Sequence, residues 1–154
     1  GIFASSGILF NHESYLRGNN FFIKKLLRGV LDIRHGKRQN LEFGNLEIKR
    51  DFGFSEKYVE AMWKMLQHSE GDDFVICSGR SVLLREVVEY VFRKCGIPKE
   101  KMTINRSLFR PTEIRDIYGS NEKAKTLLNW DYDLNFFNVL DVILQEEEAN
   151  YGKE

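Results

Sequence analysis

A short polar loop between two glycines contains side chains that could bind an anion. Within the run from Gly44 to Gly53, Asn45 provides an amide, and Lys49 and Arg50 provide adjacent cations. Glycine permits close backbone approaches, and arginine can hold a phosphate group through two hydrogen bonds. These side chains can meet a phosphate, but for the loop taken by itself the favoured interpretation is an ordinary charged loop in front of a helix.

A second polar cluster follows later in the chain, where Pro111 restricts the backbone between Arg110 and Glu113. Arg110 offers a planar fork of donors to a phosphate, and Glu113 can accept hydrogen bonds from hydroxyl groups or ring nitrogens. A surface ion pair is an equal alternative for this cluster taken by itself.

Polar residues also follow the first apolar run. Residues 2–10 read as a buried parallel strand, and Asn11 and His12 come directly after it. Open α/β sheets bind their ligands at the carboxyl ends of such strands. A local hydrogen-bonded turn is the alternative for this Asn-His pair.

We find no complete catalytic constellation in the sequence. Tyr90 and Lys94 have the Tyr-x-x-x-Lys spacing of dehydrogenases, but they lie late on an amphipathic segment, and no Gly-rich phosphate loop follows any expected strand. We interpret that spacing as chance. Three scattered histidines and two cysteines, Cys77 and Cys95, have no metal-ligand spacing, so no metal site is expected.

The composition is that of a globular protein with no strong net electrostatic field. Hydrophobic residues make up 42% of the 154 positions, and 23 basic residues balance 23 acidic ones. This balance argues against nucleic acid or a membrane surface as partner. No apolar run reaches the roughly 18 residues of a membrane span, and the two thiols fit a reduced, cytoplasmic setting. Because the chain begins at Gly1 inside a strand-like run, we expect a fragment.

Strand-like and helical patterns alternate along the chain, which predicts an α/β fold. Further strands are expected at 41–43, 49–52, 74–77, 102–104 and 108–110. Helices are expected from Asn19 or Asn20 to Gly36, from Ser55, from Gly79 and Ser81 to Gly96, from Ser120, and from Asp133 or Asn135.

The hydrophobic pattern also predicts which side chains these helices bury. The helix from Ser55 should bury four large side chains: Val59, Met62, Trp63 and Leu66. The basic side of the first helix, which includes Lys24, and the tail that begins at residues 146–148 should be solvated.

The order of the motifs resembles that of the GDP-mannose 4,6-dehydratase family. Residues 44–53 and 58–63 are similar to the family's Gly-Asn-Leu-Asp-Ala-Lys-Arg-Asp-Trp-Gly and Tyr-Val-Glu-Ala-Met-Trp. Residues 9–18 resemble Leu-Phe-Asn-His-Glu-Ser-Pro-Arg-Arg-Gly, and residues 109–113 resemble Phe-Arg-Pro-x-Glu. Residues 119–130 match Gly-Asp-x-x-Lys-Ala-x-x-x-Leu-Gly-Trp in outline, so the resemblance extends from residue 2 to about residue 144.

This resemblance implies the C-terminal part of an extended short-chain dehydrogenase/reductase. Residues 1–18 would be the end of an NADP-binding Rossmann sheet with its cofactor loop, and residues 19–154 a mixed α/β lobe that binds the nucleotide sugar. In the family, NADP oxidises the sugar at C4, water leaves across C5 and C6, and the hydride returns to C6. The product from GDP-mannose is GDP-4-keto-6-deoxymannose.

The same resemblance implies roles for individual residues. The GDP-sugar would be held by Asn11, Lys25, Asn45, Arg50, Arg110 and Glu113. NADP would be contacted by His12 and Arg17. The catalytic Ser or Thr, Glu, Tyr and Lys of the family would precede Gly1, so none is expected in this chain. The complete enzyme would be a homo-oligomer, either a dimer or a tetramer.

Among the positions that depart from the family pattern, four bear on assembly or substrate. Leu16 replaces an arginine that reaches a neighbouring subunit in the family, which puts tetramer assembly in doubt, and Phe52 replaces a tryptophan. Lys57 and Arg115 replace acids, which suggests another GDP-sugar, such as GDP-manno-heptose, as an alternative substrate. Further alternatives are a non-catalytic nucleotide-sugar-binding or assembly module, and an epimerase or 4-ketoreductase of the same superfamily.

Overall fold

The computed structural model describes residues 2–153, and the chain folds into two compact units. The first unit comprises the stretch up to Ser14, Arg50–Val82 and Asp116–Val139. The second comprises Tyr15–Lys49, Leu83–Arg115 and the stretch from Leu140 onward. The chain therefore passes repeatedly from one unit to the other.

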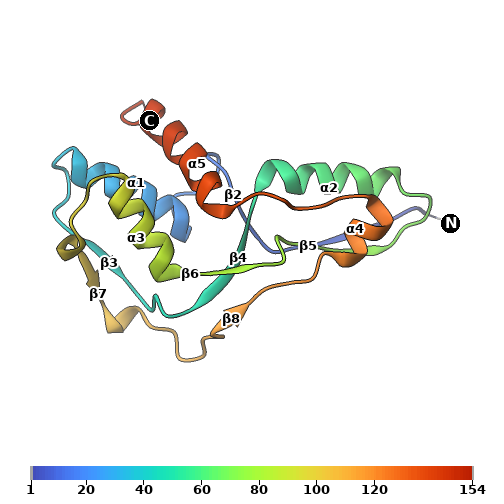
Figure 1. Cartoon of the computed structure of the whole chain (residues 1–154), viewed down its shortest axis with the longest axis horizontal. Coiled ribbons are helices and arrows are strands. Elements are labelled where there is room, and N and C mark those ends of the chain that lie inside the picture. Colours follow the sequence, from blue (N-terminus) through green and yellow to red (C-terminus); the bar gives the residue numbers. More distant parts are fainter. Residues whose placement is uncertain (1, 154) are drawn as a thin grey trace. The chain divides into compact units, whose positions relative to one another are not determined.

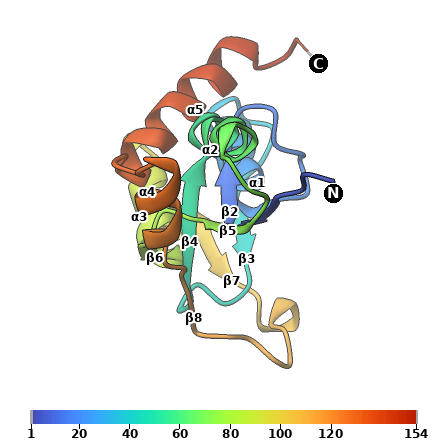
Figure 2. The same ribbon diagram turned by 90° about the vertical axis from the view of Figure 1, so that its right-hand side faces the viewer.

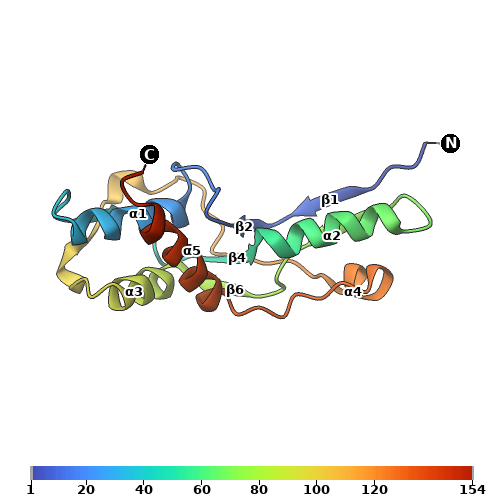
Figure 3. The same ribbon diagram turned by 90° about the horizontal axis from the view of Figure 1, so that it is seen from above.

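The first unit is built on a parallel strand pair. Strand β1 (Ser6–Leu9) pairs with β5 (Asp73–Ile76), so that Ser6 lies opposite Asp73 and Leu9 opposite Ile76. Helix α2 (Ser55–Gln67) runs alongside β1, and α4 (Glu122–Leu128) contacts both β5 and α2 (Figures 1 and 3). Their shared core is aromatic and aliphatic: Tyr58, Ala61, Met65, Phe74, Ile76, Ala124, Leu128, Trp130 and Tyr132.

A second sheet has the strand order β2-β4-β6, with β8 also paired to β4. Its strands are β2 (Asn11–Glu13), β4 (Lys49–Phe54), β6 (Ser81–Leu83) and β8 (Asp116–Ile117). Strands β2 and β4 run parallel side by side, with Asn11 opposite Phe52 and His12 opposite Gly53 (Figure 2).

The second unit packs helices on another parallel pair. Strand β3 (Leu41–Phe43) pairs with β7 (Met102–Ile104), and α1 (Phe22–Arg34) contacts both β3 and α3 (Leu84–Lys94) (Figure 1). Short 3-10 helices, η1 and η2, span Lys99–Lys101 and Arg106–Leu108. Helix α5 (Phe136–Asn150) starts in the first unit and continues into the second. Strands that alternate with helices and pair in parallel confirm the expected α/β class.

The first strand differs from the expectation of a buried element. Strand β1 covers only Ser6–Leu9 of the expected residues 2–10. The side chain of Ile2 is 97% exposed and that of Ile8 is 54% exposed. Among residues 2–153, β1 pairs with β5 alone, which explains why its apolar side chains remain accessible. The prediction of a strand was correct, but the prediction of its burial was wrong for this chain.

Helix α2 buries a different face from the one expected. Tyr58, Ala61 and Met65 are buried, whereas Trp63 is 61% exposed and Leu66 65% exposed, and Val59 and Met62 are exposed as well. The sequence carries apolar residues on two faces of this helix, and the aromatic core selects the face that carries Tyr58. The predicted buried set was therefore wrong.

The segments 81–83 and 108–110 also differ from expectation, and α1 begins after Phe21, without the expected cap from Asn19 or Asn20. Residues 81–83 form β6, and α3 begins only at Leu84, because residues 82 and 83 continue in extended conformation. Instead of a strand at 108–110, the chain forms the 3-10 helix Arg106–Leu108, in which Asn105 Oδ1 accepts from the backbone N–H of Ser107 at 3.0 Å. That local side-chain bond favours a turn over an extended segment.

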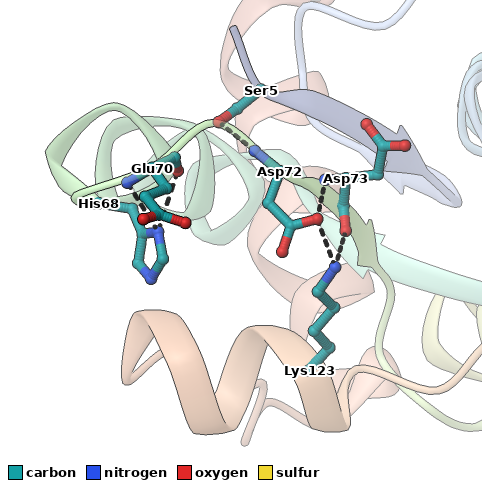
Figure 4. A network of polar contacts seen from close by, with 6 residues as sticks. All are labelled: Ser5, His68, Glu70, Asp72, Asp73 and Lys123. Atoms are coloured by element: carbon teal, nitrogen blue, oxygen red, sulfur yellow. Dashed lines mark hydrogen bonds and ion pairs between the residues drawn. The ribbon is translucent and has the colours of Figure 1, made fainter. Parts of the chain in front are cut away.

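Polar bonds fix the entrance to β5 (Figure 4). The backbone N–H of Asp72 donates to Ser5 Oγ at 3.3 Å, which ties the turn to the residue before β1. From α4, Lys123 Nζ donates to Asp72 Oδ1 at 2.6 Å and to the Asp73 carbonyl at 2.9 Å. This hydrogen bond from Lys123 holds the pKa of Asp72 below its usual value.

No helix among residues 2–153 combines the length and the apolar character that crossing a bilayer requires.

Candidate functional site

Backbone contacts hold the Gly44 loop against the segment that carries Arg110 and Glu113. A Cβ atom on Gly44 would lie 3.1 Å from the Leu108 carbonyl oxygen, so glycine allows an approach that a side chain would obstruct. At the other end of the loop, the Lys49 N–H donates to the Arg115 carbonyl at 2.7 Å. The two polar clusters recognised in the sequence therefore run beside each other in the second unit.

One side-chain bond joins these two clusters directly. Asn45 Nδ2 donates to Glu113 Oε2 at 3.1 Å, across 68 residues of sequence. The other end of the amide, Oδ1, accepts from the backbone N–H of Glu47 at 2.9 Å. Asn45 is thus held within its own loop and reaches the carboxylate of the second cluster.

The same loop also covers the start of α3. The carbonyl groups of Ile48 and Leu46 accept from the backbone N–H groups of Leu84 and Arg85, at 3.0 and 3.1 Å. The first N–H groups of a helix have no partner within the helix, so these bonds satisfy two of them. Arg85 Nε also donates to Glu47 Oε1 at 2.5 Å. The loop is consequently anchored to a helix as well as to the neighbouring segment.

The predicted ligand-binding cations of the second unit are Lys25, Arg110 and Arg17. Lys25 and Arg110 are exposed, so both can reach a ligand in solution. The guanidinium carbon of Arg17 lies 3.6 Å from the centroid of the Phe21 ring, a cation–π contact that orients the side chain at the start of α1.

Asn11, His12 and Arg50 lie on adjacent strands of the first unit. Asn11 and His12 are on β2, and Arg50 is on β4, two residues before the Phe52 that faces Asn11. His12 Nδ1–H donates to the Phe10 carbonyl at 2.8 Å, and the His12 ring lies 4.9 Å from the Tyr58 ring. These contacts fix the imidazole plane.

Asp51, next to Arg50, was not recognised from the sequence as a site residue. Its completely buried carboxylate accepts from Ser78 N at 2.9 Å and Ser78 Oγ at 2.6 Å. It also accepts from the N–H groups of Gly79 and Gly119, at 3.0 and 3.4 Å. An acid inside a strand whose next residues are apolar was the available signal. These bonds compensate the cost of burying a charge, and they hold two loops beside β4.

Burial and the charge of Asp51 together raise the pKa of two nearby groups. Burial first, and then the Asp51 charge, raises the pKa of the Cys77 thiol to about 11. The same two causes raise the pKa of Tyr58. Both groups are therefore neutral at physiological pH, and neither is poised for acid–base or nucleophilic chemistry.

Tyr90 and Lys94 make structural contacts with α5. Tyr90 Oη donates to Asp141 Oδ1 at 2.9 Å, and Lys94 Nζ donates to Asp141 Oδ2 at 2.8 Å. Burial and the bond to Asp141 raise the pKa of Tyr90. Both side chains of the Tyr-x-x-x-Lys spacing therefore bind one carboxylate on α5, that of Asp141.

No group of three or more metal-ligating side chains comes together within residues 2–153. The side chains on and beside the loop include the amide of Asn45, the cation of Arg85, and the carboxylates of Glu47 and Glu113. Cations suit phosphate, and carboxylates suit hydroxyl or amide hydrogens. The roles of the eight residues named from the sequence remain predictions, and the structure brings two of them, Asn45 and Glu113, into direct contact.

Comparison with known sequences gives a clear family match. A family model described as GDP-mannose 4,6 dehydratase matches residues 1–142. GDP-mannose 4,6 dehydratase 1 of Arabidopsis thaliana is 38% identical over 148 residues, which cover 96% of this chain and 41% of that protein. The Homo sapiens GDP-mannose 4,6 dehydratase is 41% identical over 147 residues, which cover 84% of this chain and 40% of that protein. The chain thus spans about two fifths of these curated relatives.

Solved structures share the fold. The structure of RMD from Pseudomonas aeruginosa complexed with NADPH has a TM-score of 0.81 at 23% identity, covering 94% of this chain and 47% of that one. The dTDP-glucose 4,6-dehydratase from Bacillus anthracis in complex with NAD has a TM-score of 0.80 at 18% identity, covering 94% and 44%. These likenesses confirm the expected fold class.

Proposed function

This chain belongs to the GDP-mannose 4,6-dehydratase family, and we propose that it provides the nucleotide-sugar-binding part of an enzyme that converts GDP-mannose into GDP-4-keto-6-deoxymannose and water. The observation that carries this proposal is the Asn45–Glu113 contact at 3.1 Å. It joins two family motifs that lie far apart in the sequence into one polar surface.

In the proposed site, cations bind the diphosphate and polar side chains bind the nucleoside and sugar. Arg110 and Lys25 are exposed and available to phosphate oxygens, and Arg50 is assigned the same role by its place in the family motif. Glu113 accepts hydrogen bonds from the nucleoside, and Asn11 contacts the GDP-sugar. Arginine suits phosphate better than lysine does, because its planar set of donors can bind two phosphate oxygens at once.

The cofactor in this proposal is NADP, with His12 and Arg17 as the contributions of this chain. Arg17 is oriented by Phe21, so its guanidinium can present donors to a phosphorylated dinucleotide, while the bond from His12 Nδ1–H to the Phe10 carbonyl leaves Nε2 of the imidazole for the cofactor. When bound, NADP would supply the hydride chemistry at C4 and C6 of the sugar. The chain's own residues bind and orient the two ligands.

We assign the catalytic residues to a part of the enzyme outside these 154 residues. The sequence contains no Gly-rich dinucleotide loop, and the Tyr90–Lys94 pair is bound to Asp141. In this proposal residues 1–18 complete a Rossmann sheet with its cofactor loop, and residues 19–154 form the substrate-binding lobe. The complete enzyme is a cytoplasmic homo-oligomer, either a dimer or a tetramer.

Product analysis tests the proposal. The full-length protein that contains this chain is incubated with GDP-mannose and catalytic NADP, and the nucleotide sugars are analysed by mass spectrometry and NMR. We expect loss of one water per sugar, a keto group at C4 and a methyl group at C6. Unchanged GDP-mannose, or a product of unchanged mass with inverted stereochemistry at C4, would contradict the proposed reaction.

A further inference from the structure

We propose that Asn45 is a positioning residue that orients the Glu113 carboxylate toward the nucleotide, and that it acts through Glu113 instead of touching the ligand. This inference rests on the proposed function, because it concerns the nucleoside side of the same site. It changes the role of Asn45 from a ligand-binding residue to a support for one.

The two hydrogen bonds of Asn45 use both ends of its amide. Oδ1 accepts from Glu47 N at 2.9 Å, and Nδ2 donates to Glu113 Oε2 at 3.1 Å. A backbone N–H can only donate and a carboxylate can only accept, so these partners determine which end of the amide points where. The side chain is therefore committed to linking its own loop to Glu113.

Both sides of this link are held in place. On the loop side, Glu47 accepts from Arg85 at 2.5 Å, and Gly44 lies close to the Leu108 carbonyl. On the Glu113 side, the backbone two residues later is bound to Lys49 at 2.7 Å. A glutamate without a partner can occupy several rotamers, and the bond from a fixed amide selects among them before a ligand arrives.

The oriented carboxylate fits a ligand with two neighbouring hydrogen-bond donors. A carboxylate has about four acceptor positions, so the bond from Asn45 leaves positions for such a pair. In a guanosine nucleotide this chemistry has two sources, the adjacent ribose hydroxyls and the N–H groups on one edge of guanine. Analogues that lack one donor distinguish these sources.

An isosteric change at Asn45 separates positioning from folding. Asn45→Asp keeps an oxygen that accepts from Glu47 N, but it replaces the donor to Glu113 by a second negative charge. In the full-length protein we expect the Kd for GDP to rise about tenfold by calorimetry. The thermal unfolding midpoint should change little, because the bond within the loop is kept.

The chain offers a closely matched control. Asn105 Oδ1 accepts from Ser107 N at 3.0 Å, and Asn105 Nδ2 donates to Glu42 Oε2 at 3.2 Å, which repeats the Asn45 arrangement at another turn. Asn105→Asp therefore introduces the same charge beside a carboxylate. We expect it to leave the GDP affinity within about twofold. An equal loss in both variants would contradict a specific role for Asn45.

A double-mutant cycle tests whether Asn45 acts through Glu113. In a Glu113→Gln background, Asn45→Asp should weaken GDP binding by less than about twofold, because the glutamine amide can donate to the new aspartate. Losses that multiply in the double variant would show an independent, direct contact of Asn45 and would overturn the inference.

Nucleotide analogues complete the experiment. The effect of Asn45→Asp should shrink with 2′-deoxy-GDP if Glu113 accepts from the ribose, and with IDP if it accepts from the guanine amino group. An undiminished effect with both analogues would contradict the inference. Failure of the unaltered protein to bind GDP would contradict the proposed function itself, whereas GDP binding with independent losses would contradict only the positioning role.

Discussion

Lys24 of α1 donates a hydrogen bond to Glu147 of α5 inside the second unit, and the two side chains are 4% and 0% exposed. Lys24 also donates to the Tyr15 carbonyl at 2.6 Å, and Arg28 Nη1 lies 3.8 Å from Glu147 Oε2. These interactions tie the end of the chain to the first helix and to the residue that begins the second unit. The expectation of a solvated Lys24 was therefore wrong, and so was that of a solvated Glu147, whereas Glu146 and Glu148 on either side are exposed as expected.

Breaking this pair should destabilise the protein strongly. Lys24→Met leaves the Glu147 charge buried without its main partner, so the free energy of unfolding should fall by about 3–5 kcal/mol, and Glu147→Leu should cost a similar amount. Urea unfolding of the full-length protein measures the change. The neighbouring exposed lysine is the matched control, and Lys25→Met should change stability by less than about 0.5 kcal/mol.

The double variant distinguishes a buried pair from a packing defect. With Lys24→Met and Glu147→Leu together, no buried charge remains, and most of the loss should be recovered. Losses that simply add would indicate that shape at these positions matters more than charge.

Periodicity and turn residues were sufficient to predict most elements, because those signals are local. The strand expected at 74–77 is found at Asp73–Ile76, and the helix expected to end at Gly96 ends at Lys94. Pairing between distant charges was not predictable, because Lys24 and Glu147 are separated by 123 residues and each alone resembles a solvated charge.

In the candidate site, too, the motifs could be predicted from local sequence, whereas the contacts between distant residues could not. The motifs containing Asn45 and Glu113 were recognisable from spacing and resemblance, but their mutual bond required the folded chain. Asp51 was missed because its importance comes from donors on two distant loops, at Ser78, Gly79 and Gly119. Local sequence does not reveal which loops converge on a buried acid.

Arg50 and Arg110 are expected to bind the diphosphate of the GDP-sugar. Charge-assisted hydrogen bonds of this kind contribute about 1.5–3 kcal/mol each, so Arg50→Ala and Arg110→Ala should each weaken GDP-sugar binding roughly ten- to a hundredfold. Titration calorimetry on the full-length protein measures this. Unchanged affinity in both variants would remove these arginines from the site.

Arg17 is expected to contact the cofactor and not the substrate. Arg17→Ala in the full-length protein should raise the Kd for NADP while leaving the affinity for GDP nearly unchanged. The reason is that the guanidinium, oriented by Phe21, is assigned to the cofactor phosphates. Fluorescence titration of NADPH and calorimetry of GDP measure the two affinities. Equal losses for both ligands would indicate that the loop around Arg17 is only structural.

The Asp72–Lys123 bond predicts an acid-dependent contribution to stability. Because the hydrogen bond from Lys123 lowers the pKa of Asp72 in the folded state, this contribution is present above the unfolded pKa and is lost as the pH falls through the folded pKa. Lys123→Met should therefore flatten the fall in stability below about pH 4.

Unfolding midpoints between pH 6 and pH 2 measure this dependence. Lys153→Met removes the same charge near the end of α5 and should keep the wild-type profile. A profile of Lys123→Met that parallels that of the wild type would show that the bond in Figure 4 does not stabilise the charged form of Asp72.

Calorimetric titration of the full-length protein with GDP-mannose and with dTDP-glucose measures most directly whether this chain carries a GDP-sugar site. The fold is shared with a dTDP-glucose 4,6-dehydratase, whereas the sequence belongs to the GDP-mannose family. We predict saturable binding of GDP-mannose at least about tenfold tighter than that of dTDP-glucose, and weakened by Arg110→Ala. Equal or tighter binding of dTDP-glucose, or GDP-mannose binding that does not respond to Arg110→Ala, would contradict a GDP-sugar site on this chain.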